Sequence, residues 1–169
     1  MWIGISGKMG VGKDYIVNNY LSKLYEKSII ISFADMIKIN LMVHNNINLN
    51  ELYGHKTPEI RKLLQYEGTE NGRDKYGQDI WIKYVKSWGE LYLSRGYKYI
   101  IVTDVRFKNE YEFIKNNNGI VIRINASNRN EKRLRNESLN EEEYNKIKNH
   151  ISEIDLDQVD FDLIINNDI

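Results

Sequence analysis

The sequence predicts an α/β fold built on a parallel sheet. A short apolar run, Trp2 to Ile5, precedes the glycine-rich stretch 7–14, and an amphipathic run from Tyr15 to Leu24 follows it. Strand, glycine-rich loop and helix in this order are the context in which G-x-x-x-x-G-K indicates a phosphate site. A second β-rich run, 28–32, comes after the helix. A buried strand after a helix is typical of a βαβ unit, so we expect parallel strands.

The glycine-rich loop is the candidate phosphate site, and it consists of Gly7, Lys8, Met9, Gly10, Val11, Gly12, Lys13 and Asp14. Its glycines allow backbone N–H groups to approach an anion, and the following helix points its positive end at the same place. Lys13 adds a charge for the terminal phosphates of a ligand. The alternative is a glycine-rich turn that binds no ligand.

Asp14 stands where Ser or Thr usually supplies a hydroxyl to Mg²⁺. A carboxylate this close to phosphates is repelled unless a cation lies between them, and Mg²⁺ prefers oxygen ligands. We therefore expect Asp14 to meet the metal through a water. The alternative is that Asp14 only complements the positive end of the helix dipole.

Composition excludes several classes of protein. The 169 residues carry 24 Lys and Arg against 24 Asp and Glu, so we expect a mononucleotide-sized anion as partner rather than a nucleic-acid polymer. Cysteine is absent, which excludes disulfides and thiolate metal sites. No apolar run has the length of a membrane span, and Met1 leads directly into the first strand. We expect no membrane partner, no signal peptide and a cytoplasmic location, in the host cell if the protein is viral.

The remaining chain predicts three more strands, at 99–103, 120–124 and 161–165, with helices between them. Thr57 and Pro58 are typical of a helix start, and Asp79 of another. Residues 39–57 are rich in asparagine, and we expect them to be irregular. We expect a single domain, with subdomains inserted at 33–97 and 125–150.

Charged residues at strand ends are further site candidates, because ligands bind at the carboxyl ends of parallel strands. Asp35 and Lys38 follow the second strand, and Asp104 and Arg106 follow the third. Asp104 has the position of a Mg²⁺-organising carboxylate in a phosphate-loop enzyme. The alternatives are solvated surface charges and ordinary turn chemistry.

The stretch 125–149 is polar and contains Arg129 and Arg133. One interpretation is a solvated helical hairpin or a floppy insert. The other is a mobile lid, with little core to anchor it, that brings arginines over a transferring phosphoryl group.

Several of these pieces occur together in one known family. They are Gly12-Lys13-Asp14, Phe33-Ala34-Asp35, Leu64-Gln65-x-x-Gly68-Thr69-Glu70-x-x-Arg73, Asp79-x-Trp81, Asp104-Val105-Arg106-Phe107-x-Asn109-Glu110 and His150-x-Ser152-Glu153-x-x-Leu156-Asp157. With them the chain resembles the deoxynucleoside monophosphate kinases of large DNA phages and viruses, and more distantly the phosphomevalonate kinases. The resemblance covers nearly the whole chain.

The resemblance implies an adenylate-kinase-like fold: a P-loop core with a five-stranded parallel sheet (1–32, 98–124, 151–169), a nucleoside-monophosphate region (33–97) and a lid (125–150). It implies transfer of the γ-phosphoryl of ATP, with Mg²⁺, to a deoxynucleoside monophosphate. The resemblance further implies the following roles: Lys13 and the loop amides for the donor; Arg129 and Arg133 for the transferring group; Arg61, Arg73 and Arg106 for the acceptor phosphate; Gln65, Glu70 and Trp81 for base and sugar; Asp14 and Asp104 for the metal. The chain ends soon after the fifth strand, so we also expect a more open adenine pocket.

Three other functions stay open at this stage. One is a kinase of another small phosphorylated metabolite, similar to phosphomevalonate kinase, although the block from Gln65 to Arg73 and Trp81 favour a nucleotide acceptor. The second is a nucleotide-hydrolysing switch. The third is a binder without catalysis, which intact Lys13 and Asp104 argue against. The sequence leaves open which bases are accepted, how strictly a 2′-deoxy sugar is required and whether the protein forms a homodimer.

Overall fold

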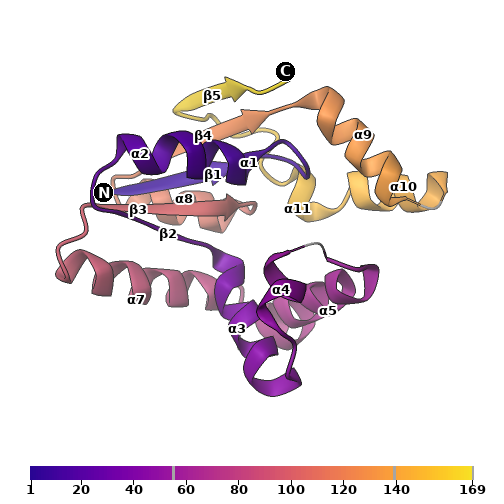
Figure 1. Cartoon of the computed structure of the whole chain (residues 1–169), viewed down its shortest axis with the longest axis horizontal. Coiled ribbons are helices and arrows are strands. Elements are labelled where there is room, and N and C mark those ends of the chain that lie inside the picture. The colour runs from indigo at the N-terminus through magenta and orange to yellow at the C-terminus, as the bar shows by residue number, and fades with distance from the viewer. Residues whose placement is uncertain (55, 139, 169) are drawn as a thin grey trace. The chain divides into compact units, whose positions relative to one another are not determined.

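A five-stranded sheet with the order β2-β3-β1-β4-β5 organises the larger part of the chain in the computed structural model (Figure 1). The strands are β1 (Trp2–Ser6), β2 (Ser28–Ile31), β3 (Tyr99–Val105), β4 (Ile120–Asn125) and β5 (Leu163–Asn166). The pairings of β1 with β3 and β4, and of β4 with β5, are parallel. The predicted fold class, a P-loop core with a five-stranded parallel sheet, is confirmed.

The structure describes residues 1–54, 56–138 and 140–168, and the chain divides into two units. The larger unit contains 1–30 and 92–169, and the smaller contains 31–91. The subdomain expected from the sequence at 33–97 corresponds to this smaller unit. Within the described residues, none of the helices has both the length and the apolar character needed to cross a membrane.

Strand β1 alternates between two helical layers because successive side chains of a strand point to opposite faces. Ile3 and Ile5 belong to the core cluster that includes Ile16, Val17 and Leu21, from the helical stretch of α1 (Lys13–Ile16), η1 (Val17–Leu21) and α2 (Ser22–Leu24). This stretch is helical through a π turn, and its Tyr20 and Leu24 are exposed.

The other face of β1 meets α8 (Lys108–Asn116). The Trp2 ring packs edge-on against Phe113 at 5.0 Å between centroids. A Cβ on Gly4 would lie 3.0 Å from Val105 Cγ2 and 3.3 Å from Ile114 Cγ1. Glycine therefore allows α8 to pack closely against the central strand.

The hairpin of α9 (Ser127–Glu137) and α10 (Glu141–Lys148) has a core of its own. Leu134 and Tyr144 are buried, and the Tyr144 hydroxyl donates to Glu131 Oε2 at 2.5 Å. The segment is therefore a helical hairpin with a small core, where little core was expected, and its closing as a lid stays a prediction. A short helix, α11 (Ile151–Ile154), follows the hairpin and leads toward β5.

The smaller unit is helical. Its elements are α3 (Phe33–Asn45), α4 (Leu49–Tyr53), α5 (Pro58–Gly68), η2 (Thr69–Arg73), α6 (Asp74–Tyr76) and the first part of α7 (Ile80–Ser94). Residues 39–57 are mostly helical, so the prediction of an irregular segment is wrong. Asn46 ends α3 in a left-handed conformation with φ 58°, and the Asn48 side chain caps α4 by accepting from Glu51 N at 3.1 Å.

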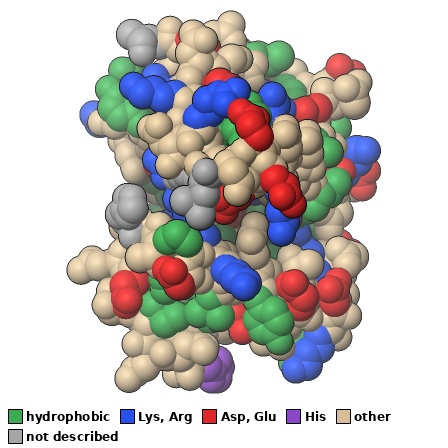
Figure 2. Space-filling model, turned by 90° about the vertical axis from the view of Figure 1, so that its right-hand side faces the viewer, with side chains coloured by type: hydrophobic (Ala, Val, Ile, Leu, Met, Phe, Trp, Pro, Cys, Tyr) green, Lys and Arg blue, Asp and Glu red, His purple; other side chains and the backbone are tan. Residues whose placement is uncertain are grey.

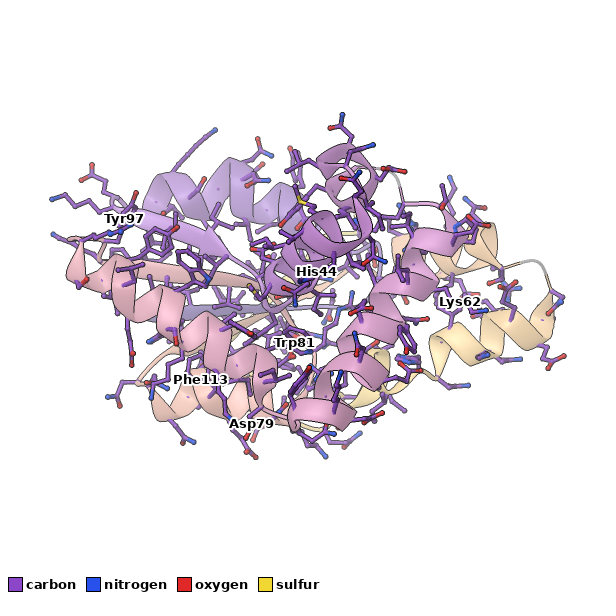
Figure 3. All side chains as sticks on the ribbon, turned by 90° about the horizontal axis from the view of Figure 1, so that it is seen from below. His44, Lys62, Asp79, Trp81, Tyr97 and Phe113 are labelled. Carbon is purple, nitrogen blue, oxygen red and sulfur yellow. The ribbon has the colours of Figure 1, made fainter. Side chains whose placement is uncertain are left out.

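Trp81 is the buried centre of the smaller unit (Figure 3). Its side chain is 5% exposed, and its Nε1 donates to the carbonyl of Gly68 at 2.9 Å. Gly72 lies against the indole ring, where a Cβ would come within 2.3 Å of Trp81 Cζ2 and 2.7 Å of Glu67 O. The indole therefore fixes the end of α5 and the η2 turn from behind.

Gly72→Ala tests this packing. We expect the free energy of unfolding to fall by about 1–3 kcal/mol, because the new methyl group would overlap both a ring and a backbone carbonyl. The matched control is Gly68→Ala, whose Cβ would meet only the flexible end of Ile37 at 3.2 Å. Urea unfolding followed by circular dichroism compares the two. Equal stability of both variants would contradict the tight contact at Gly72.

Candidate functional site

The glycine-rich loop joins β1 to α1 in a shape that glycine makes accessible. Gly10 and Gly12 have φ 75° and 85°, in the left-handed region. A Cβ on Gly10 would lie 2.9 Å from Arg133 Cβ, and one on Gly12 would lie 2.8 Å from Arg129 Nη1. The glycines thus permit both the turn of the loop and the close approach of two arginines from α9.

Lys13 lies beneath the loop. Its Nζ donates to the carbonyls of Gly7 at 2.7 Å and Lys8 at 3.0 Å. The pKa of the Lys13 ammonium is lowered to about 7, mainly by burial and also by the charge of Arg106, while Glu153, Asp14 and Asp104 act in the opposite direction. A phosphate next to this ammonium would favour its charged form.

The start of α9 is fastened to the loop and to the segment after β5. Arg129 Nη2 donates to the carbonyl of Asn167 at 2.7 Å, and Asn130 Nδ2 donates to the carbonyl of Met9 at 2.7 Å. The carboxylate of Asp168 accepts from the first amides of α9, at 2.8 Å from Ser127 N. Asn167 Nδ2 also donates to the carbonyl of Val11 at 2.9 Å. The hydrogen bonds place the first turn of α9 at the loop.

Charged side chains gather around a polar hollow beside the loop. The hollow is lined by Ser6, Gly7, Lys8, Val105, Arg106, Arg123, Ser152, Glu153 and Leu156. Asp157 pairs with Lys8 at 2.8 Å and with Arg123 at 3.2 Å. The buried Arg123 also donates to Ser6 Oγ at 3.0 Å, and its burial lowers its pKa. Figure 2 shows lysine and arginine side chains interspersed with aspartate and glutamate on the face that it draws.

Asp14 and Asp104 are the carboxylates that could hold Mg²⁺. Asp14 is exposed in the first turn of α1, and Asp104 belongs to β3, which runs two residues further than the predicted end at Thr103. Both raise the pKa of Lys13, so both lie within electrostatic range of its ammonium. Mg²⁺ is commonly bound by one or two carboxylates together with phosphate oxygens and water, and this pair fits that donor set.

Two predicted acceptor residues form a cluster in the smaller unit. Asp35 Oδ2 accepts from Ser32 N at 2.7 Å at the start of α3, and its Oδ1 accepts from the Tyr53 hydroxyl at 2.9 Å. Lys38 Nζ lies 3.5 Å from Asp35 Oδ1 and 3.9 Å from the centre of the Tyr53 ring. Asp35 is therefore both a helix cap and the partner of Lys38.

The other predicted acceptor residues lie on α5 and η2. Arg61 and Arg73 are half-buried, and Gln65 and Glu70 are exposed. Trp81 is buried behind the η2 turn, with its N–H bonded to Gly68. Its indole is thus placed to support the turn that carries Glu70 and Arg73.

Some residues at the loop have no role that their local sequence predicts. Glu153 and Asp157 belong to the motif that begins at His150, but their partners lie far back in the chain. Arg123 could have been noticed, because a charge inside the apolar run Ile120–Ile124 is rare unless it is paired. Asn167 has no feature in the sequence that would indicate its role at the loop.

The fold and this site together define a P-loop kinase, a class of phosphotransferase. Shikimate kinase from Aquifex aeolicus superposes with a TM-score of 0.50 at 14% identity, covering 100% of this chain and 87% of that one. The protein TT1252 from Thermus thermophilus superposes with a TM-score of 0.56 at 17% identity, covering 99% of this chain and 88% of that one. At these identities the two structures support the fold.

The family follows from the sequence. The family model of phosphomevalonate kinase matches residues 5–119, and the chain belongs to this family. A protein of Acanthamoeba polyphaga mimivirus, assigned as a deoxynucleotide monophosphate kinase, is 29% identical over 72% of this chain and 72% of its own.

The lowered pKa of Lys13 predicts that ATP binding takes up a proton. At about pH 8 the ligand-free ammonium is mostly deprotonated, whereas the phosphates of bound ATP favour the charged form. Uptake should approach about one proton at pH 8 and become small near pH 6, and affinity for ATP should fall as the pH rises above about 7. Calorimetry in buffers of different ionisation enthalpy measures the uptake.

The variant Lys13→Met provides the control for this uptake. It removes the titrating group, so the proton uptake at pH 8 should disappear together with most of the affinity. Uptake that persists in Lys13→Met would assign the proton to another group.

Proposed function

We propose that the protein transfers the γ-phosphoryl group of ATP to a deoxynucleoside monophosphate, giving ADP and a deoxynucleoside diphosphate. The observation that carries the proposal is the half-buried Lys13 beneath a loop on which two arginines of α9 lie. Phosphoryl transfer depends on positioning and on neutralising negative charge that is spread over the transferring group. A cluster of fixed cations around a phosphate loop supplies both.

The donor is held by the loop in this proposal. The amides of Gly10 to Asp14 and the Lys13 ammonium bind the phosphates of ATP, and Arg129 and Arg133 neutralise the equatorial oxygens of the group in transfer. Asp14 and Asp104 would hold Mg²⁺, and the ion would neutralise part of the phosphate charge. The acceptor phosphate is already anionic, so the reaction requires no strong general base.

The acceptor in this proposal is a deoxynucleotide. The 29% identity to the mimivirus protein assigned as a deoxynucleotide monophosphate kinase supports this choice. Arg61, Arg73 and Arg106 would bind the acceptor phosphate, because arginine matches its geometry with paired N–H donors. Gln65 and Glu70, exposed on α5 and η2, offer hydrogen bonds to base and sugar. Asp35 and Lys38 form a second polar cluster in the same unit.

A second candidate acceptor follows from the family itself. The match to the phosphomevalonate kinase model favours a small phosphorylated metabolite other than a nucleotide. The donor half of the site serves either acceptor, so the choice rests on the residues of α5 and η2.

A panel assay separates the candidates. ADP formation is measured with ATP and Mg²⁺ for each deoxynucleoside monophosphate, each ribonucleotide counterpart and phosphomevalonate, with a control that lacks acceptor. Our proposal expects turnover with at least one deoxynucleotide above that control. Turnover with phosphomevalonate in place of every nucleotide would establish the second candidate, and equal ADP formation without acceptor would indicate a nucleotide-hydrolysing switch.

Asp14→Asn tests the metal role. The change keeps the shape of the side chain and removes its charge, so turnover should fall at least about tenfold, the scale of about 1.4 kcal/mol in the barrier, and the Mg²⁺ requirement should rise. Thermal stability should change little, because the helix dipole contributes about 0.3–1 kcal/mol. A Mg²⁺ titration of the initial rate gives the answer. If rate and metal dependence are those of the wild type, Asp14 serves the helix and not the metal.

Arg61→Ala and Arg73→Ala test the acceptor assignment. Each truncation should cost about 1.5–3 kcal/mol in kcat/KM for the acceptor, the scale of a hydrogen bond to a charged group. Affinity for ATP should stay unchanged. Lys62→Ala is the control, since Lys62 is exposed on the same helix. Weakened ATP binding in either arginine variant would move that residue to the donor side.

A further inference from the structure

Glu153 is a buried carboxylate with an unusual pair of partners. It lies on α11 and is 6% exposed. Its Oε2 accepts from the backbone N–H of Met9, inside the glycine-rich loop, at 2.8 Å. Its Oε1 pairs with Arg106 Nη1. A single side chain from the segment after the hairpin is thus bonded to the phosphate loop and to the residue that follows β3.

The backbone of Arg106 is fixed separately from its side chain. Its N–H donates to Glu110 Oε2 at 2.8 Å, in the cap of α8. The guanidinium receives its orientation from Glu153 and from the carbonyl of Ser152 at 3.4 Å. Without the Glu153 carboxylate the Arg106 side chain would lose the anion that holds it beside the loop.

Glu110, which caps α8, provides a comparison within the same protein. It is also buried, and it accepts from the N–H groups of Arg106 and Phe107 at 2.8 and 3.1 Å. Both are cap contacts at the start of α8. Glu153 differs because its partners are a loop amide and a charged side chain of the site.

We propose that Glu153 is a positioning residue for phosphoryl transfer, whose buried carboxylate holds the Arg106 guanidinium and the Met9 amide in a fixed relation beside Lys13. The role of Arg106 toward an acceptor phosphate rests on the proposed function. The link between Glu153 and the loop rests on the contacts themselves.

The contacts of Glu153 make this role measurable. Neutralising the carboxylate removes the charged partner of the Arg106 guanidinium and weakens the anchor of Met9 N inside the loop. Because the loop binds the donor in the proposed function, affinity for ATP should fall, and kcat should fall as well.

Glu153→Gln is the principal test, because the amide keeps an oxygen for Met9 N and loses the charge. ATP binding by calorimetry should show a weaker affinity than in the wild type, because Met9 N and Arg106 lose the charge that holds them. With the acceptor identified by the panel assay, kcat should fall roughly tenfold or more. Asp155→Asn is the matched control, since Asp155 lies two residues further on and accepts from Lys108 N at 2.7 Å, at the start of α8.

A second variant tests the proposal if Glu153→Gln does not fold. Glu153→Asp keeps the charge and shortens the reach, so kcat should fall, and affinity for ATP should fall less than in Glu153→Gln. Wild-type kcat in Glu153→Asp would overturn the positioning role, and so would an unchanged ATP affinity in a folded Glu153→Gln. The ATP-binding measurements need no acceptor, so they test Glu153 even if no deoxynucleotide is phosphorylated.

Discussion

The burial of the Lys13 ammonium is the constraint on which the rest of the site depends. A charge taken out of water is costly unless other charges and hydrogen bonds compensate. Lys13 has two loop carbonyls as partners, and the nearby Arg106 makes its charged form less favourable. The carboxylates of Glu153, Asp14 and Asp104 oppose that effect. Carboxylates of the same chain therefore help Lys13 to keep the charge with which it would bind the phosphates of a ligand.

The topology of the sheet explains where these charges come from. In a parallel sheet the carboxyl ends of all strands lie on one edge, and ligands bind there. β1 leads into the loop, β3 into Arg106, β4 into the start of α9, and β5 into Asn167. The order β2-β3-β1-β4-β5 places β1 between β3 and β4. Residues far apart in the sequence thus reach the loop from strands that lie next to it.

Local patterns predicted the elements that local physics determines. The loop, the cap at Thr57 and the apolar strands follow from spacing and residue type, and the structure contains them at nearly the predicted positions. Residues 39–57 were mispredicted because asparagine favours loops in general, whereas here Asn46 ends one helix and Asn48 begins the next. Asparagine therefore marks the ends of helices here rather than a long loop.

The hairpin after β4 illustrates a different limit. Its polar composition suggested little core, yet Leu134 and Tyr144 are enough to bury a small interface between two helices. Amphipathic helices in a pair need few apolar residues when long polar side chains cover the edges. Arg135 covers the edge in this way, with its Cζ 4.6 Å from the centre of the Tyr144 ring.

Electrostatic pairing across the chain was the least predictable part of the site. Glu153 bonds Met9, and Asp157 bonds Lys8, at separations of 144 and 149 residues. No local pattern specifies which of many acidic residues will meet which cation, because that choice is made by the sheet order and the path of α11. A motif can mark Glu153 as notable, but its partners become visible in the folded chain.

The attachment of α9 gives its two arginines different surroundings. Arg129 is in the first turn, where Asn130 bonds the loop and Asp168 bonds the helix start. Its guanidinium is held by the carbonyl of Asn167. Arg133 lies one turn further along the same face and is exposed. Any rotation of the hairpin about its fastened end displaces a residue in proportion to its distance from that end. In the proposed reaction, in which both arginines neutralise the transferring phosphoryl group, Arg129 therefore acts from the fastened end of the hairpin, and Arg133 is the arginine whose distance to that group depends on the position of the hairpin.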